Sequence, residues 1–432
     1  MRDDTMRSDG FKQRIPVALV YLLMFQNLFN AGSPFATLAL NLGVATVVLI
    51  QSRGCCRIPD RMVLFGTYAV LMWLFLVIIY RGGVETQIFQ KYVRITLTIS
   101  LVTIVFGSGM VEPRTIIKAI NLSLGFHVAL VLLQIVFPDI TYTTAVIFGF
   151  DRDLAILDNY ALRKLGASSS YDTASLLSVL ALTFFYLQFH QSHRKSLLLM
   201  MVLSFIATLM SSRMGIAFSM SIIALISIRG LLNARMWGKG VIVIGASCFY
   251  VFSYLYVYPI FAHSLGISDL TSRDTGLIFS PADYGTTGTL EALTGEFLEP
   301  LNQPLGDLLI GFGLDPNSIS RFSDIGYVKM IYHVGIIGTV LIMLSHTYMC
   351  VMLMRRGRWT KRGAELSTIR QFLFIVLLLG IAFNYKSLEL YSRGVGDFIF
   401  IVFLFLASTR RTVESNRIPV PLRALTTRQC PE

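Results

Sequence analysis

Long apolar blocks, separated by short polar segments, follow one another along most of the chain. Each block is continuously apolar rather than alternating. A helix needs about 20 apolar residues to cross a hydrocarbon core of roughly 30 Å, whereas a transmembrane β-barrel would show alternation. The pattern therefore predicts an all-α polytopic integral membrane protein with about twelve transmembrane helices, at 15–30, 35–51, 62–80, 91–107, 115–137, 172–189, 196–210, 214–228, 239–261, 326–354, 369–385 and 395–408.

Two longer polar segments interrupt this pattern. The larger is 262–325, and the smaller is 138–171, whose mixed charges are typical of a solvated surface. Other connections are short, so neighbouring helices are expected to pack antiparallel. We therefore divide the chain into four parts. Residues 1–261 contain transmembrane helices one to nine and the smaller outside loop 138–171, and residues 262–325 form the large outside loop. Residues 326–408 contain helices ten to twelve, and residues 409–432 form a cytoplasmic tail.

Composition and charge agree with a membrane chain. Hydrophobic residues make up 54% of it and charged residues only 14%, against about a quarter in soluble domains. The net charge of +12 would fit a nucleic-acid binder. However, with a cytoplasmic N-terminus, 25 of the 37 Lys and Arg residues fall in inside segments. That is the positive-inside rule, so we expect membrane lipids as partners, no nucleic acid, and both termini in the cytoplasm.

Sequence motifs of several catalytic classes are absent. There is no GxxxxGK loop of the kind that cradles nucleotide phosphates, so ATP-driven chemistry is not expected. No histidine pair has metal-ligand spacing with a carboxylate nearby. We therefore expect neither a metal nor any other cofactor.

Among the ionisable residues within the predicted helices, Arg94 falls in the fourth helix, and Lys118 and His127 fall in the fifth. Such residues are costly at membrane depth and are candidates for function. Arg94 and Lys118 lie near helix ends, where long side chains can reach the interface, and we expect this of both. His127 is deeper and is expected to be a neutral histidine, hydrogen-bonded between helices.

The large loop 262–325 carries nine acidic residues but only two basic ones, Arg273 and Arg321. An anionic group held there needs arginines placed locally, since guanidinium donates two hydrogen bonds to phosphate. Arg213 lies in a tight hairpin at the same outside surface. Ser323 or Asp324 can cap the helix that begins near Gly326. These arginines are candidates for binding an anion at the mouth of the bundle.

Lys329 and His333 lie four residues apart, on one face of the helix that follows this loop. They can face a common cavity or line one lipid-exposed edge. Residues 289–301 show apolar positions at helical spacing, which predicts a short amphipathic helix over the bundle mouth. A helix that merely caps the bundle would show the same pattern.

Several short motifs follow one another in a recognisable order. A Ser-Arg-x-Gly hairpin precedes a large outside loop with an arginine; a Pro-Leu-Gly and a Gly-x-Gly turn follow, and then a Ser-Asp-x-Gly-Tyr step into a helix. This order resembles the O-antigen polymerase (Wzy) and O-antigen ligase (WaaL) superfamily. The matching positions are Ser212-Arg213-Met214-Gly215, Arg273, Pro304-Leu305-Gly306, Gly311-Phe312-Gly313, Ser323-Asp324-Ile325-Gly326-Tyr327 and Gly335-Ile336-Ile337-Gly338.

The resemblance implies a GT-C-like, O-antigen ligase-like fold in the bacterial inner membrane, with the outside loops in the periplasm. It implies a glycosyltransferase that polymerises undecaprenyl-diphosphate-linked repeat units in lipopolysaccharide biosynthesis. Its partners would be a lipid-linked glycan donor and acceptor, and a chain-length regulator protein. Ligases usually carry a histidine at the step into the helix after the loop. Here that place is Ser323-Asp324, which favours the polymerase.

Roles for individual residues follow from the chemistry that the resemblance implies. The leaving diphosphate needs fixed cations, which Arg213, Arg273 and Arg321 would supply. The acceptor hydroxyl benefits from a base, for which Asp324 or Asp274 is available. Further cavity residues are Tyr327, Lys329 and His333. The alternatives left open are an O-antigen ligase, another lipid-linked glycosyltransferase or exopolysaccharide polymerase, a transporter or flippase of lipid-linked oligosaccharides, and a structural membrane protein.

Overall fold

All regular structure in the described part of the chain is α-helical. The computed structural model describes residues 17–29, 34–54, 56–148, 164–168, 170–211, 215, 219, 222, 303–314, 326–354, 364–384 and 394–417. The chain divides into two compact units. Unit 1 comprises Met1–Ser123, Val340–Ile381 and Glu389–Glu432, and unit 2 comprises Leu124–Thr339 and Ala382–Leu388.

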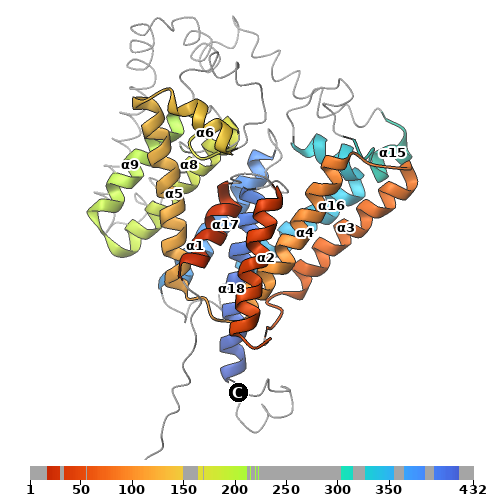
Figure 1. The fold of residues 1–432 in the computed structure, drawn as a ribbon, viewed down its shortest axis with the longest axis horizontal. Coiled ribbons are helices and arrows are strands. Elements are labelled where there is room, and N and C mark those ends of the chain that lie inside the picture. The colour runs from red at the N-terminus through yellow and green to blue at the C-terminus, as the bar shows by residue number, and fades with distance from the viewer. Residues whose placement is uncertain are drawn as a thin grey trace, which may run out of the picture. The chain divides into compact units, whose positions relative to one another are not determined.

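Helices occupy ten of the twelve apolar segments predicted from the sequence (Figure 1). Of the other two, 239–261 lies outside the described residues, and 214–228 is described only at 215, 219 and 222. The ten helices are α1 (Val17–Phe29), α2 (Pro34–Gln51), α3 (Arg61–Arg81), α4 (Thr86–Gly107), α5 (Pro113–Val136), α8 (Tyr171–Ser192), α9 (Lys195–Leu209), α16 (Gly326–Met354), α17 (Ala364–Phe383) and α18 (Val395–Arg417).

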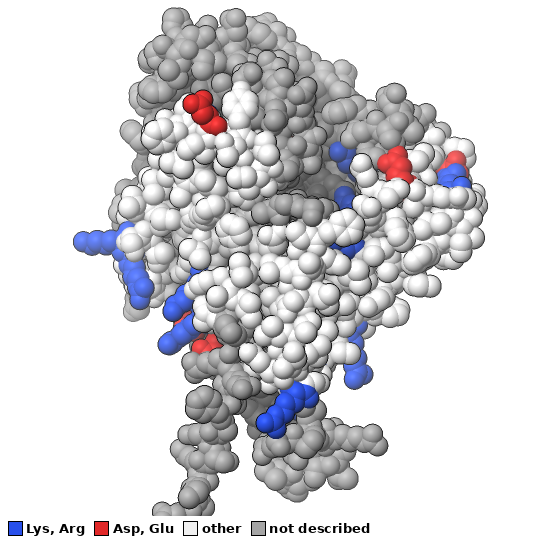
Figure 2. Space-filling model, in the orientation of Figure 1, with Lys and Arg blue, Asp and Glu red and all other residues white. Residues whose placement is uncertain are grey.

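Six of these helices are long and apolar enough to cross a membrane: α3, α4, α5, α8, α16 and α17. Large apolar side chains on their surfaces are exposed, such as Phe65 and Ile79 on α3. Figure 2 shows that charged residues are few and scattered on the described surface in view. Lipid tails accept such a surface and water does not. These features identify a helical protein of the membrane-embedded type.

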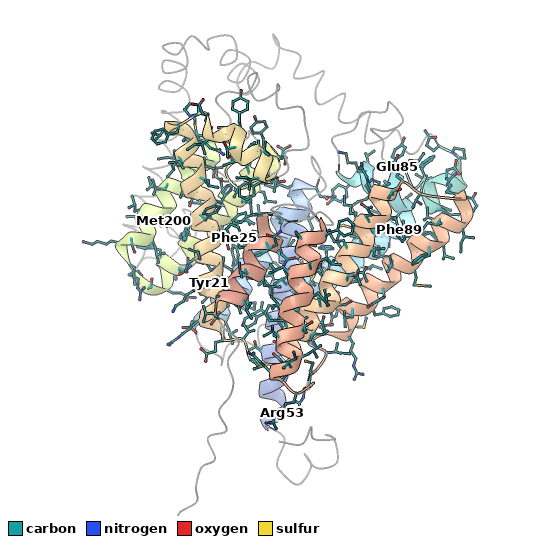
Figure 3. All side chains as sticks on the ribbon, in the orientation of Figure 1. Tyr21, Phe25, Arg53, Glu85, Phe89 and Met200 are labelled. Carbon is teal, nitrogen blue, oxygen red and sulfur yellow. The ribbon has the colours of Figure 1, made fainter. Side chains whose placement is uncertain are left out.

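Unit 1 contains α1 to α4, α17, α18, the first part of α5 and the second part of α16. Within it, α4 packs against α2, α3 and α18, while α1 packs against α2 and α18. Phe106 of α4 meets Phe405 of α18 edge to face, with ring centroids 5.6 Å apart. Arg53 and Glu85, which flank α3 in the sequence, lie at opposite ends of this unit (Figure 3).

The start of α3 is fixed by a capping residue. The Asp60 carboxylate accepts hydrogen bonds from the backbone N–H groups of Met62 and Val63, at 2.9 and 3.2 Å. A side-chain oxygen at this position satisfies amides that have no partner inside the helix. Asp60 also accepts a hydrogen bond from the Tyr348 hydroxyl of α16 at 3.0 Å. One carboxylate therefore both begins α3 and ties it to α16.

Unit 2 contains the second part of α5, α8, α9, the first part of α16, and two shorter helices, α6 (Ile140–Phe148) and α15 (Leu305–Ile310). Helices α8 and α9 form an antiparallel hairpin and pack closely. Ser170 caps α8 by accepting from the Thr173 amide. His193 ends it in the left-handed conformation, with φ of 51°. The Ser170 side chain therefore fixes the start of α8, and the left-handed conformation of His193 fixes its end.

The described parts of the smaller polar segment are helical or buried. Helix α6 occupies Ile140–Phe148, and further along the segment Lys164 is only 5% exposed. The expectation of a solvated surface was therefore wrong for Lys164, because a mixed charge pattern says nothing of long-range packing, while the charged residues from Asp151 to Arg163 lie outside the described residues. Here residues 164–168 pack beside α5, whose polar side chains bind their backbone.

Candidate functional site

The predicted site falls largely outside the described residues. Arg213, Arg273, Asp274, Arg321 and Asp324 all lie outside them, so their predicted roles stay predictions. The predicted amphipathic helix 289–301 also lies outside them. Three predicted cavity residues are described, and all three lie in the first turns of α16, which begins two residues after Asp324.

Tyr327, Lys329 and His333 have different surroundings. Tyr327 is half-buried and packs with Val328 and Tyr332. Lys329 is half-buried as well. His333 is 2% exposed, so the imidazole does not lie on a lipid-exposed edge. Of the two arrangements left open for this pair, the lipid-facing one is therefore wrong for His333.

Helix α16 is kinked at Gly335, just after these residues. Gly335 has φ of 67° and ψ of −177° within an otherwise helical segment. Only glycine adopts this conformation without strain. A Cβ at this position would lie 2.3 Å from the Leu309 carbonyl oxygen of α15. The kink thus requires glycine for both its backbone angles and its close neighbour.

The turn that follows α15 packs directly onto this kink. Gly311 has φ of 99°, and a Cβ there would lie 2.4 Å from the Gly335 nitrogen. The Phe312 and Gly313 amides both donate to the Tyr332 carbonyl, at 2.8 and 3.1 Å. The Phe312 ring stacks on that of Tyr332, with centroids 4.9 Å apart. Two glycine motifs noted in the sequence therefore meet backbone to backbone.

A third motif glycine has an equally close neighbour in unit 2. Gly215, from the Ser-Arg-x-Gly hairpin, lies against α8 and α9. A Cβ on it would come 1.7 Å from Ser175 Oγ and 3.1 Å from the Thr208 methyl carbon. A larger residue would force the Ser175 hydroxyl into another position and tighten the contact with Thr208. The glycine at the end of this motif is therefore explained by packing.

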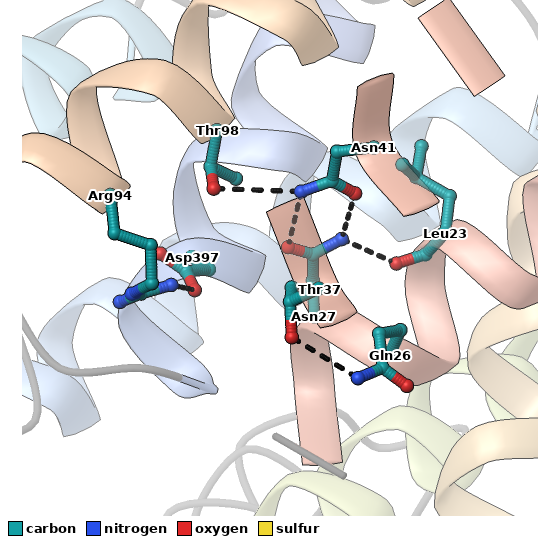
Figure 4. Close-up of polar contacts among 8 residues, drawn as sticks. All are labelled: Leu23, Gln26, Asn27, Thr37, Asn41, Arg94, Thr98 and Asp397. Atoms are coloured by element: carbon teal, nitrogen blue, oxygen red, sulfur yellow. Dashed lines mark hydrogen bonds and ion pairs between the residues drawn. The ribbon is translucent and has the colours of Figure 1, made fainter. Parts of the chain in front are cut away.

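Arg94 is buried and paired, so the expectation that its side chain reaches the membrane interface was wrong. Its guanidinium forms an ion pair with the Asp397 carboxylate of α18 (Figure 4). Arg94 is 6% exposed and Asp397 1%. Burial makes an ion pair the only inexpensive arrangement for a charged arginine. The partner is 303 positions away in the sequence, and no local signal pointed to it.

Beside this ion pair, unit 1 contains a buried network of amides and hydroxyls. Asn27 of α1 and Asn41 of α2 exchange hydrogen bonds, at 2.9 and 3.2 Å. Asn41 also donates to the Thr98 hydroxyl of α4 at 3.5 Å. Gln26 donates to the Thr37 hydroxyl at 3.1 Å (Figure 4). Such bonds hold helices together where apolar side chains alone give no preference over lipid.

His127 behaves as predicted. It is fully buried, and Nδ1 accepts the Ala167 N–H at 3.2 Å. An amide can only donate, so Nδ1 is unprotonated and Nε2 carries the proton of the neutral ring. Nε2 lies 3.0 Å from both the Ala174 carbonyl and the Ser178 hydroxyl of α8. Lys118 is exposed near the start of α5, as expected of a side chain that reaches the interface.

Within the described ranges, no group of three His, Cys, Asp or Glu residues is placed to hold a metal ion. The apolar helices define the class, a helical protein of the membrane-embedded type. Comparison of the sequence with protein-family models found no matching family, and comparison with curated proteins found no match.

Proposed function

We propose that this chain is a membrane glycosyltransferase of the O-antigen polymerase type, which joins lipid-linked polysaccharide repeat units. The observation that carries the proposal is the contact between the Gly311-Phe312-Gly313 turn and the kink at Gly335. Both belong to the pattern that resembles the polymerase family. Scattered glycines are weak evidence, whereas glycines required by one shared contact support treating the pattern as a single structural motif.

In the proposed reaction, a growing glycan leaves undecaprenyl diphosphate and joins a new lipid-linked unit at its non-reducing end. The bond between the anomeric carbon and the diphosphate breaks, and a bond to the acceptor oxygen forms. Arg213, Arg273 and Arg321 would neutralise the charge that develops on the diphosphate. Asp324 or Asp274 would accept the hydroxyl proton. The reaction would take place at the periplasmic face of a bacterial inner membrane, in a bundle of about twelve helices.

The described residues of α16 fit this assignment in position and chemistry. Lys329 adds a cation five positions after Asp324 in the sequence, and Tyr327 adds a hydroxyl. His333 is buried next to Tyr332, whose carbonyl binds the glycine turn. The kink would thus fix the start of α16 relative to α15, and a leaving group held by the preceding loop would meet a rigid surface.

Transport of a lipid-linked oligosaccharide is a second candidate, because unit 1 holds the buried Arg94–Asp397 ion pair. Ionisable groups at membrane depth often mark substrate or ion pathways. Transporters commonly place such groups near the middle of the bundle. A structural ion pair that orients α4 and α18 would give the same geometry. The two functions differ in which intermediate accumulates when the protein fails.

The test is to examine surface glycan made by cells carrying Arg213→Ala, Arg273→Ala or Arg321→Ala. Each variant should lose the ladder of long glycans and keep a single-repeat band, since initiation and export are untouched. Arg194→Ala, an exposed arginine on the connection between α8 and α9, is the matched control and should keep the ladder. Wild-type glycan lengths from all three variants would overturn the polymerase proposal. Complete loss of surface repeats in the double variant Arg94→Met with Asp397→Leu, at normal protein levels, would favour transport.

A further inference from the structure

Three arginines lie where α2 turns into α3, on residues 52–62, which we call the α2–α3 corner. Arg53 follows the end of α2, Arg57 comes next, and Arg61 is the first residue of α3. Within the corner, all residues but Cys55 are described. Since α3 is a candidate membrane span that begins at Arg61, the corner lies where the apolar part of the bundle ends. The charge distribution of the sequence predicts that this end faces the cytoplasm.

Backbone contacts hold the α2–α3 corner in place. The Gly54 amide donates to the Leu49 carbonyl at 2.9 Å, which closes the end of α2. The Arg57 amide donates to the carbonyl of Gly107, the last residue of α4, at 3.0 Å. A Cβ on Gly107 would lie 2.2 Å from the Arg57 carbonyl oxygen, so these two backbones are in close contact. Asp60 then caps α3. The arginines therefore project from a fixed turn.

The three guanidinium groups of the corner have no counter-ion among the described residues. All three arginine side chains are exposed, and none of them forms a hydrogen bond or an ion pair within the described part of the chain. In contrast, Arg114, an exposed arginine of the same unit, pairs with Glu365 at 2.8 Å. The one acidic residue in the sequence of the corner is Asp60, which is buried, and its oxygens accept from two α3 amides and the Tyr348 hydroxyl. Three arginines and one aspartate give the corner a net charge of +2.

Exposed apolar side chains accompany these cations. Ile58 is 44% exposed although it lies in a polar turn, and Met62 and Phe65, in the first turns of α3, are exposed as well. Exposed apolar residues continue along α3 at Met72, Leu76 and Ile79. The surface is thus cationic where the span begins and apolar along the helix. An anionic phospholipid has the complementary chemistry, with a charged phosphate at one end and hydrocarbon tails that accept apolar side chains.

We propose that the α2–α3 corner binds the headgroup of an anionic phospholipid through Arg53, Arg57 and Arg61. Guanidinium donates two parallel hydrogen bonds to a phosphate, and basic residues beside a membrane span attract anionic lipids. The positive-inside rule explains why basic residues gather at this end of the bundle. It does not require a fixed turn, unpaired guanidinium groups or an exposed Ile58, all of which a bound lipid uses. The proposal does not depend on the reaction proposed above.

The test measures binding of phosphatidylglycerol to the purified full chain in a non-ionic detergent, by native mass spectrometry. Phosphatidylcholine with the same acyl chains is the comparison lipid, because its headgroup has no net charge. The wild type should bind phosphatidylglycerol more tightly. Each of Arg53→Gln, Arg57→Gln and Arg61→Gln should weaken that binding about 5-fold, the effect of one cation near an anionic surface. Equal affinity of the wild type for the two lipids would overturn the proposal.

Arg114→Gln is the matched control, because it removes an exposed arginine of unit 1 whose charge already faces a carboxylate. It should leave phosphatidylglycerol binding unchanged. A loss as large as that of the corner variants would mean that overall charge attracts the lipid, and the proposed site would be wrong. Soluble glycerol 3-phosphate should not displace the lipid, since it has no tails to lie along α3. Full displacement at equal concentration would show a site for soluble anions and would also overturn the proposal.

A lysine variant separates lipid binding from the role of arginines in membrane insertion. Arg53→Lys, Arg57→Lys and Arg61→Lys, made together, keep the positive charges that orient the helices. This triple variant should insert and fold normally, yet bind phosphatidylglycerol more weakly than the wild type, because an ammonium group cannot donate two parallel hydrogen bonds. Where a Gln variant fails to fold, the lysine variant decides the question. An affinity equal to that of the wild type would overturn the assigned guanidinium–phosphate contacts.

Discussion

Replacing Asp397 by Asn should be one of the most destabilising single changes in unit 1. It leaves the guanidinium of Arg94 in a buried place without the negative charge that it faces in the wild type. Removing one partner of a buried ion pair costs about 3–5 kcal/mol, because the remaining charge is uncompensated. Since about 1.4 kcal/mol corresponds to a factor of ten, the folded population relative to the unfolded one should fall at least about 100-fold.

Reversible unfolding in mixed micelles, followed by loss of helical signal, measures this cost. The matched control is Glu365→Gln, which breaks the exposed pair between Arg114 and Glu365. Their side chains are 77% and 41% exposed, so that pair should contribute no more than about 1 kcal/mol. The double variant Arg94→Met with Asp397→Leu should recover much of the loss, because neither charge is then buried.

This reasoning would be refuted by an Asp397→Asn protein as stable as Glu365→Gln. It would also be refuted by a double variant that is less stable than both Arg94→Met and Asp397→Leu. Either result would mean that burial does not determine the energy of the Arg94–Asp397 pair.

Two further predictions concern unit 2. Gly335→Ala should destabilise the fold by more than about 2 kcal/mol, because it causes both a strained backbone and a steric clash. Gly43→Ala on α2, where a Cβ meets no atom within 4 Å, should be close to neutral in the same unfolding assay. Equal effects of the two substitutions would contradict the account of the kink. Lys164 binds fewer protons when folded than when unfolded, because its folded pKa is lowered, so stability should rise with pH until the ordinary value of 10.5. Thermal midpoints of wild type and Lys164→Met should converge as pH rises, and a constant difference would contradict the burial of a titrating ammonium.

The helices were predictable because their signal is local. The block predicted at 326–354 coincides with α16, and those at 115–137 and 172–189 match α5 and α8 closely. Length and apolar content decide such segments, since a backbone in lipid must satisfy its own hydrogen bonds. The kink at Gly335 was not predicted, because hydropathy is the same for a bent helix as for a straight one.

The polar contacts were harder to predict, because each depends on residues far apart in the chain. Arg94 lies close enough to a helix end for its side chain to reach the interface, and only the position of α18 shows that Asp397 is its partner. The position of Gly166 and Ala167 depends in the same way on Gln134 and His127. In contrast, His127 was correctly assigned because its depth within α5 left a neutral, hydrogen-bonded ring as the least costly state.

The most direct test of the polymerase account is deletion of the gene, followed by electrophoresis of the surface polysaccharide. The account predicts that the ladder of long glycans disappears while the band carrying a single repeat remains, and that the intact gene restores the ladder. A complete loss of repeat units, or a ladder that does not change, would contradict it.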